Sequence, residues 1–538
     1  MITRNIKHFL IAGSLCCGTA VALTACADWN DHYEDPLSLA GSEPTLWQAM
    51  QQRAELSDFR EVLSQTKVFK HHQKTGVSYA DLLNGVQTYT VMAPVNGSFN
   101  KDSVLSLLAT NRGDSVVERT FVGNHLSYNL TSNTEKPTEF FLLNTKRATI
   151  GNNKALEIPI KEANVKAKSG IMHVMQSTLP YRYNLYEIMI NDPRYSGIGE
   201  QLRSYEQDEF SPTQSVEGGM VDGEQIYADS VFIERNLLLE RVGRLAAEDS
   251  TYLFVVPTSN EWQRVWQEAM DFFRFDAKVE NGDSLQRYWA NYALLNDAIF
   301  SRTIQASPKD SLVTYGYDKR YPKYHVFHRP FDKGGILYGA TAEEYSNGTL
   351  YTASQWPFNP LTTYHRELKA EGERTGLIIQ DDQCTYTTRT HVADSISENE
   401  YLVITPKSST SNWTVTFKLE NTLAGTYDIC AVILPHTVYD PNAQVKPCQF
   451  KAEINYVDET GKEQAFDCEN VKFNSDPTRV DTVMLAENFT FPVCNYGETN
   501  MKFSLKLQCS ILARETSKFA REMYLDCIYL RPKLKNEE

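Results

Sequence analysis

The chain has 538 residues, which is too long for one hydrophobic core and predicts about three domains. Its composition, with 41% hydrophobic and 22% charged residues, is that of an ordinary globular protein. The formal net charge of −15 argues against nucleic acid or an anionic membrane surface as a partner.

The first 25 residues have the three parts of an export signal. Arg4 and Lys7 form a basic start, an apolar stretch covers residues 9–23, and small residues precede Cys26. The apolar stretch is too short for a transmembrane helix. The four residues that end in Cys26 are typical of the site at which bacterial signal peptidases cut before a cysteine that becomes lipidated. We expect residues 1–25 to be removed, which would bring the net charge to −17, and Cys26 to carry the lipid.

Residues 26–44 begin with an acidic, unpatterned stretch that we interpret as a tether. This stretch resembles the surface-export signal of Bacteroidetes lipoproteins. The resemblance implies a chain anchored in the outer membrane by lipid and facing the cell exterior. Two alternatives stay open, namely a lipid anchor that faces the periplasm and an ordinary secretory signal with a chance cysteine.

The block from Thr45 to Pro180 begins with a helical pattern and continues with strands. Apolar residues recur at steps of three and four from Leu46 to Leu63, which predicts helix. Residues 89–99 (YTVMAPVNGSF) predict a buried strand, ended by a proline and an Asn-Gly turn, before a new helix. Residues 121–126 (FVGNHL) precede alternating strands, and residues 169–180 (SGIMHVMQSTLP) close the block.

These segments resemble the signature segments of the fasciclin domain and occur in the order that the family has them. The resemblance implies a fasciclin-like fold for residues 45–182 and structural roles for His125 and His173. One departure is Ser169, where the family usually has asparagine. We expect Gly170 to provide the left-handed backbone geometry that this turn needs.

A second, weaker copy of the pattern covers residues 183–358. Residues 251–262 (TYLFVVPTSNEW) match the first segment with Trp262 in place of phenylalanine. Residues 347–357 (NGTLYTASQWP) match the closing segment with tyrosine in place of histidine. The stretch between Arg203 and Asn236 is rich in Glu, Gly, Ser and Asp, which predicts an inserted loop.

Residues 359–538 lack helical periodicity and alternate strands with turns, as in an all-β sandwich. The expected strands are residues 401–405, 413–419, 427–434, 450–457, 483–491, 502–507 and 524–530. The segments GTYDICAV and YLDCIYLRP resemble the galactose-binding-like jelly roll of many carbohydrate-binding modules. The predicted fold class is therefore α+β, with two fasciclin-like domains followed by an all-β jelly-roll sandwich.

Seven cysteines remain once the signal and the lipidated residue are set aside, and all lie after residue 380. They are Cys384, Cys430, Cys448, Cys468, Cys494, Cys509 and Cys527. An odd number cannot all pair, and no C-x-x-C spacing indicates zinc. We expect most of them to be small buried thiols, with one or two disulfides left open.

The sequence contains no pattern that is typical of catalysis. It lacks a Gly-x-Ser-x-Gly elbow, a phosphate-binding glycine loop and a metal-binding histidine spacing. The acid pairs Glu343-Glu344 and Asp381-Asp382 are adjacent, so they do not suggest glycoside hydrolysis. We predict no enzyme, no cofactor and no metal ligand, although carboxylates distant in sequence could still converge.

Exposed aromatic residues beside charges can bind a sugar, whose rings have flat apolar faces and polar rims. The stretch from residue 315 to residue 324 offers Tyr315, Tyr317, Arg320, Tyr321 and Tyr324. The alternative is a hairpin whose tyrosines fold back onto a sheet. In the sandwich, Trp413 alternates with apolar residues and is expected in the core, whereas Tyr364, Tyr386 and Tyr439 lie in less regular sequence and are candidate ligand contacts.

These patterns favour a non-catalytic surface lipoprotein that binds a glycan or another extracellular ligand. The lipoprotein resemblance implies a role beside a SusC/SusD-type outer-membrane nutrient transporter, with no nucleic acid as partner. The alternative is an adhesion or docking protein that binds protein partners through its fasciclin-like domains and holds no glycan. An enzyme with an active site assembled from scattered carboxylates is the third hypothesis.

Overall fold

The computed structural model describes residues 43–70, 73–110, 113–221, 224–301, 310–315, 325–468, 471–497 and 502–534. The expected signal, lipidated Cys26 and most of the tether lie outside the described residues, as do Tyr317, Arg320, Tyr321 and Tyr324. Within the described ranges, no helix combines the length and apolar character needed to cross a membrane. The chain divides into two compact units, residues 1–182 and 183–538.

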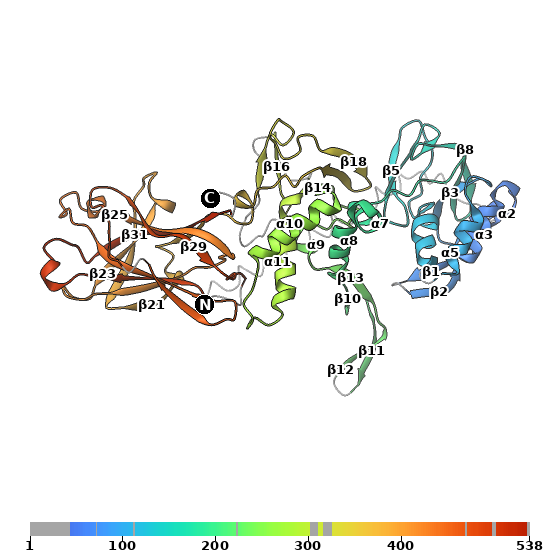
Figure 1. The fold of residues 1–538 in the computed structure, drawn as a ribbon. Helices are drawn as coiled ribbons and strands as arrows, with labels where there is room; N and C mark the ends of the chain where they lie inside the picture. The colour runs from blue at the N-terminus through green and yellow to red at the C-terminus, as the bar shows by residue number, and fades with distance from the viewer. Residues whose placement is uncertain are drawn as a thin grey trace, which may run out of the picture. The chain divides into compact units, whose positions relative to one another are not determined.

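The first unit packs short helices against a seven-stranded sheet (Figure 1). Its helices are α2 (Leu46–Gln51), α3 (Ser57–Gln65), α4 (Tyr79–Leu83), α5 (Lys101–Leu108) and α6 (Gly113–Val117), and η2 (Glu118–Val122) follows as a π-helical turn. In sheet order the strands are β4 (Leu126–Ser127), β3 (Tyr89–Pro94), β9 (Gly170–Met175), β8 (Ile158–Ala167), β7 (Lys154–Ala155), β6 (Arg147–Gly151) and β5 (Thr138–Phe141). A separate two-stranded sheet pairs β1 (Lys67–Lys70) antiparallel with β2 (Gln73–Ser78).

The helical pattern from Leu46 to Leu63 is broken in the structure. Thr45 caps α2 by accepting from the Gln48 backbone N–H, and a 3₁₀ turn over Ala54–Leu56 separates α2 from α3. The apolar residues of both helices still reach one core, because Leu46, Phe59 and Leu63 are fully buried.

A parallel strand pair, β3 with β9, forms the centre of the first unit. Tyr89 pairs with Gly170 in this register. Gly170 has φ +134°, and a Cβ at this position would lie 1.8 Å from the Tyr89 carbonyl oxygen. Glycine is therefore required both by its backbone conformation and by the closeness of β3.

The same parallel pair occurs in the second unit, between β14 (Tyr252–Pro257) and β19 (Gly348–Ala353). Tyr252 pairs with Gly348, whose φ is +156° and whose added Cβ would lie 2.1 Å from the Tyr252 carbonyl oxygen. Asn347 accepts from the Leu185 backbone N–H at 2.9 Å. The equivalent bond in the first unit joins the Leu46 N–H to the Ser169 hydroxyl at 3.0 Å. Serine thus replaces asparagine while the contact with the first helix is kept.

The remaining elements of this α/β part surround β14 and β19. The sheet order is β15-β14-β19-β18, and β16 pairs antiparallel with β17 in a separate two-stranded sheet. The elements are α7 (Leu185–Asn191), α8 (Ser196–Arg203), α9 (Leu239–Val242), α10 (Ser259–Phe272), α11 (Gly282–Ala298), β15 (Ile299–Ser301), β16 (Ser311–Val313), β17 (Val326–His328) and β18 (Thr341–Tyr345). Trp262 is buried at the centre of this core, at the position where the first copy has phenylalanine.

The stretch between Arg203 and Asn236 is not a loop, so this prediction was wrong. It forms two antiparallel strand pairs, β10 (Glu206–Phe210) with β13 (Phe232–Asn236) and β11 (Val216–Val221) with β12 (Glu224–Asp229). We call residues 206–236 the arm. In Figure 1 the arm extends away from α8 and α9 as a narrow ribbon. Bulges interrupt β11 at residues 216–219, so the strand does not keep a regular alternation of side chains. Together with the many Gly, Ser and Asp residues, this irregularity concealed the strands in the sequence.

The C-terminal part of the second unit is a sandwich of two six-stranded sheets. One sheet has the order β22-β23-β31-β25-β29, with β20 paired to β31, and the other has the order β21-β24-β30-β26-β27, with β28 paired to β26. The strands are β20 (Leu368–Glu371), β21 (Ile378–Asp382), β22 (Cys384–Thr390), β23 (Glu400–Pro406), β24 (Thr414–Lys418), β25 (Gly425–Leu434), β26 (Gln449–Val457), β27 (Glu463–Asp467), β28 (Phe473–Asn474), β29 (Asp481–Phe491), β30 (Ser504–Cys509) and β31 (Met523–Lys533).

The sandwich core lies between the two sheets and contains Trp413, which is fully buried and donates its indole N–H to the Arg521 carbonyl at 2.6 Å. All seven strands expected in this region are present. All seven cysteines are buried. Together with the helices of residues 46–298, these sheets confirm the α+β class.

Candidate functional site

The aromatic residues proposed as ligand contacts occupy different environments. The ring of Tyr315 packs edge-on against buried Tyr252, with 5.4 Å between the ring centroids, so it folds back onto the core. Tyr364 lies against Phe272 and Phe273, at centroid distances of 5.8 and 6.1 Å. Burial raises the pKa of the Tyr364 phenol far above its ordinary value. Tyr315 and Tyr364 are therefore packing residues, which corrects the expectation that they face a ligand.

Two predicted ligand contacts lie in the sandwich, and one is packed against the core while the other is exposed. Tyr386 on β22 packs against the core between the sheets, because its position in the strand points it inward. Tyr439, by contrast, is 60% exposed and directly follows the short 3₁₀ turn η7 (His436–Val438). Of the predicted residues that the structure describes, Tyr439 is the one whose ring is open to solvent.

Arg389 on β22 holds the exposed ring of Tyr439. The centre of its guanidinium group lies 3.5 Å from the Tyr439 ring centroid, which is the separation of a stacked cation–π pair. The guanidinium also donates to the Tyr524 hydroxyl at 3.4 Å. Among the described residues Arg389 forms no ion pair with a carboxylate, and the largest contributions of its neighbours to its pKa come from the tyrosines 401, 439 and 524.

Buried rings support this pair from below. Tyr401 on β23 and Tyr524 on β31 are at most 4% exposed, and their centroids are 5.5 Å apart. His436 lies 4.6 Å from the Tyr524 ring, and its Nε2 atom is 3.1 Å from the Glu522 carbonyl oxygen. Arg389 thus extends from a strand whose neighbouring rings are buried, and Tyr439 stacks on it from the turn that follows η7. This stacking restricts both side chains before a ligand binds.

This arrangement combines an exposed ring with a planar cation that has no ion-pair partner among residues 43–534 as far as the structure describes them. The aromatic ring can stack on the apolar face of a sugar ring. The guanidinium has five N–H donors in a fixed plane, which suit vicinal hydroxyls or a carboxylate. The pair has the chemistry of a saccharide contact, and nothing in it provides a nucleophile or a general acid.

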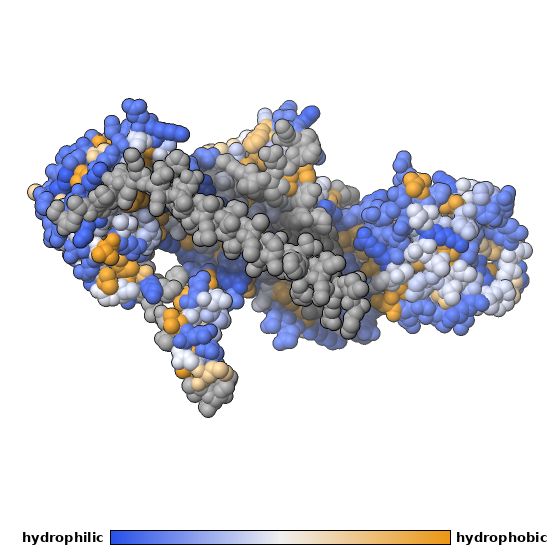
Figure 2. Space-filling view, turned by 180° about the vertical axis from the view of Figure 1, so that it is seen from behind, coloured by the Kyte–Doolittle hydropathy of each residue, from blue (hydrophilic) through white to orange (hydrophobic). Residues whose placement is uncertain are grey.

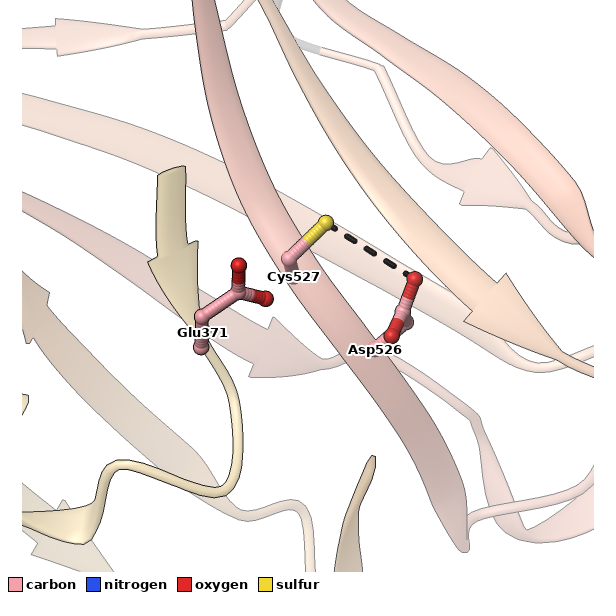
Figure 3. Close-up of side chains that lie close together, drawn as sticks. All are labelled: Glu371, Asp526 and Cys527. Atoms are coloured by element: carbon pink, nitrogen blue, oxygen red, sulfur yellow. Dashed lines mark hydrogen bonds between the residues drawn. The ribbon is translucent and has the colours of Figure 1, made fainter. Parts of the chain in front are cut away.

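A second cluster lies in the same sheet of the sandwich (Figure 3). The ligand atoms of Glu371 on β20 and of Asp526 and Cys527 on β31 all lie within 4.8 Å of one another. Ser397 donates its backbone N–H to Asp526 at 3.0 Å and its hydroxyl to Glu371 at 2.9 Å. The other oxygen of Glu371 is buried without a hydrogen-bond donor, as is one oxygen of Glu373.

Two buried carboxyls at this distance repel each other when both are charged. Burial, with Glu371 as a further cause, raises the pKa of the Asp526 carboxyl to about 6. Burial also raises the pKa of the Cys527 thiol, which therefore stays protonated and donates to Asp526 at 3.8 Å. The carboxylate oxygens could contribute ligands to an oxygen-binding cation such as Ca²⁺, whereas the protonated Cys527 thiol is not the thiolate that zinc binds.

The carboxylate cluster was missed by the sequence analysis, which predicted no metal ligand. Glu371 and Asp526 come from the first and last strands of the sandwich, so no local spacing indicates them. Both side chains are at most 5% exposed, so a substrate cannot reach them. They do not supply the open pair of carboxylates that glycoside hydrolysis uses.

The two histidines at fasciclin signature positions are buried and hydrogen-bonded. His125 accepts from the Leu179 N–H at 3.0 Å, and its other ring nitrogen donates to the Phe121 carbonyl at 2.7 Å. His173 lies 2.9 Å from the Thr131 carbonyl oxygen. Burial lowers the pKa of both imidazoles, to about 4 for His125. These contacts confirm the structural role expected for them.

No protein-family model and no curated protein matches the chain. Similar solved structures include a FAS1 domain pair of the insect cell adhesion molecule Fasciclin I, at 11% identity and a TM-score of 0.19, covering 51% of this chain and 89% of that one. A CBM22-2 xylan-binding domain from Paenibacillus barcinonensis matches at 9% identity and a TM-score of 0.21, covering 31% and 99%.

The CBM22-1–GH10 modules of a Clostridium thermocellum xylanase match at 10% identity and a TM-score of 0.20, covering 29% of this chain and 26% of that one. This chain therefore spans about a quarter of that xylanase structure. At these scores the similarity assigns neither a ligand nor an activity to this chain.

Proposed function

We propose that this chain is a non-catalytic, lipid-anchored protein of the cell surface that binds a glycan through its C-terminal sandwich. The exposed Tyr439 ring, stacked on the guanidinium of Arg389, is the observation that supports this function. The expected lipid on Cys26 would hold the chain at the outer membrane. The proposal includes a role beside a SusC/SusD-type transporter, to which a retained glycan would be delivered.

The stacked pair supports glycan binding because neither side chain has its usual structural role, which is burial for the tyrosine and an ion pair for the arginine. Large aromatic side chains are normally buried, yet the Tyr439 ring is mostly exposed. Surface arginines usually pair with carboxylates, whereas the described neighbours of Arg389 are tyrosines. A sugar ring that stacks on Tyr439 while its hydroxyls or carboxylate accept from Arg389 would use both groups.

The experiment is affinity electrophoresis of the chain from Asp28 onward through gels that contain a panel of neutral and acidic polysaccharides. We expect at least one polysaccharide to retard the wild-type chain. Tyr439→Ala should abolish the retardation, and Arg389→Lys should weaken it because lysine keeps the charge but loses the planar fork.

Tyr338→Ala is the matched control, because Tyr338 is 62% exposed on the α/β part of the same unit. It should leave retardation unchanged. Equal retardation of Tyr439→Ala and the wild type would show that Tyr439 does not contribute to polysaccharide binding. If no polysaccharide retards the wild type, glycan binding fails, and the docking function described in the sequence analysis becomes the better account.

A further inference from the structure

The arm is an exposed two-stranded ribbon with many apolar side chains on its surface. A two-stranded hairpin is marginally stable in water unless something packs against it. In Figure 2 apolar patches alternate with polar ones along the arm. Its exposed apolar residues are Val216, Met220, Ile226, Phe232 and Ile233, with exposed fractions between 37% and 70%.

The arm also places like charges opposite each other. In the β10–β13 register Asp208 lies directly across from Glu234, and both side chains are exposed. Like charges at directly opposed positions destabilise a strand pair. Burial, with Glu234 as the second cause, raises the pKa of Glu206 on the same face. Three carboxyls therefore crowd one face of the ribbon.

The single cation of the arm does not relieve this repulsion. Arg235 lies on the opposite face of β13, where it is bound by Glu209 and by Glu240 of α9. Among the described residues, Asp208 and Glu234 have no ion-pair partner in this structure. The repulsion between Asp208 and Glu234 therefore remains in the folded chain. Unrelieved local repulsion of this kind is typical of functional surfaces.

An aromatic cluster continues the acidic face. Phe210 pairs with Phe232 two positions along from Asp208 and Glu234, so all four side chains point to the same side. The Phe210 ring lies 5.7 Å from Phe232 and 4.8 Å from Tyr227, between centroids. The Phe232 side chain is 46% exposed. The face thus presents carboxylates next to an exposed aromatic anchor.

The negative charge of the arm favours a cationic partner. Residues 206–236 contain eight acidic residues and one arginine, a net charge of −7. A second copy of the arm would bring the same charge, and an anionic lipid surface would repel it. A cationic protein surface would neutralise Asp208 and Glu234 and cover the aromatic rings at once.

We propose that the acidic face of the arm is a docking surface for a protein partner whose lysine or arginine side chains flank an apolar groove. Carboxylates 208 and 234 set the charge preference, and Phe232 fills the groove. This surface is separate from Tyr439 and does not depend on glycan binding.

The test uses the chain from Asp28 onward and a defined probe, a fluorescent peptide of 14 residues that alternates lysine with isoleucine or phenylalanine. Binding is followed by fluorescence anisotropy, against a second peptide with glutamate in place of lysine. We expect the wild type to bind the lysine peptide and not the glutamate peptide. Phe232→Ser should weaken binding at least about tenfold, as for an interface anchor.

Asp208→Lys separates docking from folding. The introduced lysine would face Glu234 and replace repulsion by attraction, so hydrogen exchange in β10 and β13 should become slower. The same variant should bind the lysine peptide about tenfold more weakly, because the face loses two units of negative charge. A merely structural role of the acids would change hydrogen exchange and leave peptide binding intact.

Two control variants lie on β21, which is distant from the arm in sequence. Asp381→Lys makes the same change in net charge as Asp208→Lys, and Ile379→Ser removes an apolar residue that is 53% exposed, as Phe232→Ser does. Both should bind the peptide like the wild type. The proposal would be overturned by equal losses in the controls or by a wild type that ignores the lysine peptide. It would also be overturned by arm-dependent dimers in sedimentation or by arm-dependent binding to anionic vesicles.

Discussion

The buried imidazole of His125 predicts that the first unit loses stability in mild acid. Its two ring nitrogens are both used in the neutral form, one as acceptor from Leu179 and the other as donor to Phe121. Protonation would place a hydrogen on Nε2, where it would face the Leu179 N–H and abolish that hydrogen bond. The pKa is lowered from 6.5 to about 4, mainly by burial.

The direction of the pH effect follows from this shift. Below pH 6.5 the unfolded chain takes up a proton at His125, whereas the native chain does not until about pH 4. The stability is therefore fully present above pH 6.5 and is lost as the pH falls to about 4. A shift of about 2.5 units at about 1.4 kcal/mol each gives a loss of about 3 kcal/mol.

The control is His125→Gln, because glutamine can accept and donate without titrating. The assay is hydrogen exchange of β3 and β9 in rising urea at pH 7 and pH 4, corrected for intrinsic exchange rates, which reports on this unit alone. We expect the free-energy difference between wild type and variant to shift by about 3 kcal/mol in favour of the variant at pH 4. The same difference at both pH values would show that His125 does not control the acid stability of this unit.

Three further predictions concern the second unit. Asn347→Ala should destabilise the α/β part by about 2–4 kcal/mol in urea unfolding, because it leaves buried backbone groups of Leu185, Leu245 and Ala247 unpaired, whereas Asn347→Ser should cost less. Millimolar Ca²⁺ should raise the thermal midpoint of the wild type and not of Asp526→Asn; equal calorimetric scans would contradict the cation site. The seven cysteines after residue 380 should react with a thiol reagent only after denaturation; rapid labelling of the native chain would disprove their burial.

The sequence was most informative where local patterns determine structure. The seven strands expected in the sandwich are all found, because each carries an apolar alternation that the opposing sheet buries. The buried strand expected within residues 89–99 is likewise found, as β3, whereas its parallel pairing with β9 was not predicted. Gly170 was expected to adopt left-handed geometry, and its φ is positive.

Features that depend on distant residues were missed. The Glu371–Asp526 cluster joins the first strand of the sandwich to the last, and only the pairing of β20 with β31 brings them together. Tyr364, Tyr386 and Tyr439 lie in less regular sequence, and only packing shows that Tyr439 is exposed while the other two are covered. The arm was read as a loop because its glycines and acids conceal the strand period.

The measurement that tests the glycan-binding claim most directly is calorimetric titration of the wild type, Tyr439→Ala and Tyr338→Ala with an oligosaccharide from the polysaccharide that retards the chain most. Glycan binding at Tyr439 predicts an affinity at least about tenfold lower for Tyr439→Ala, which corresponds to about 1.4 kcal/mol, and an unchanged affinity for Tyr338→Ala. Equal affinities for all three proteins would contradict it.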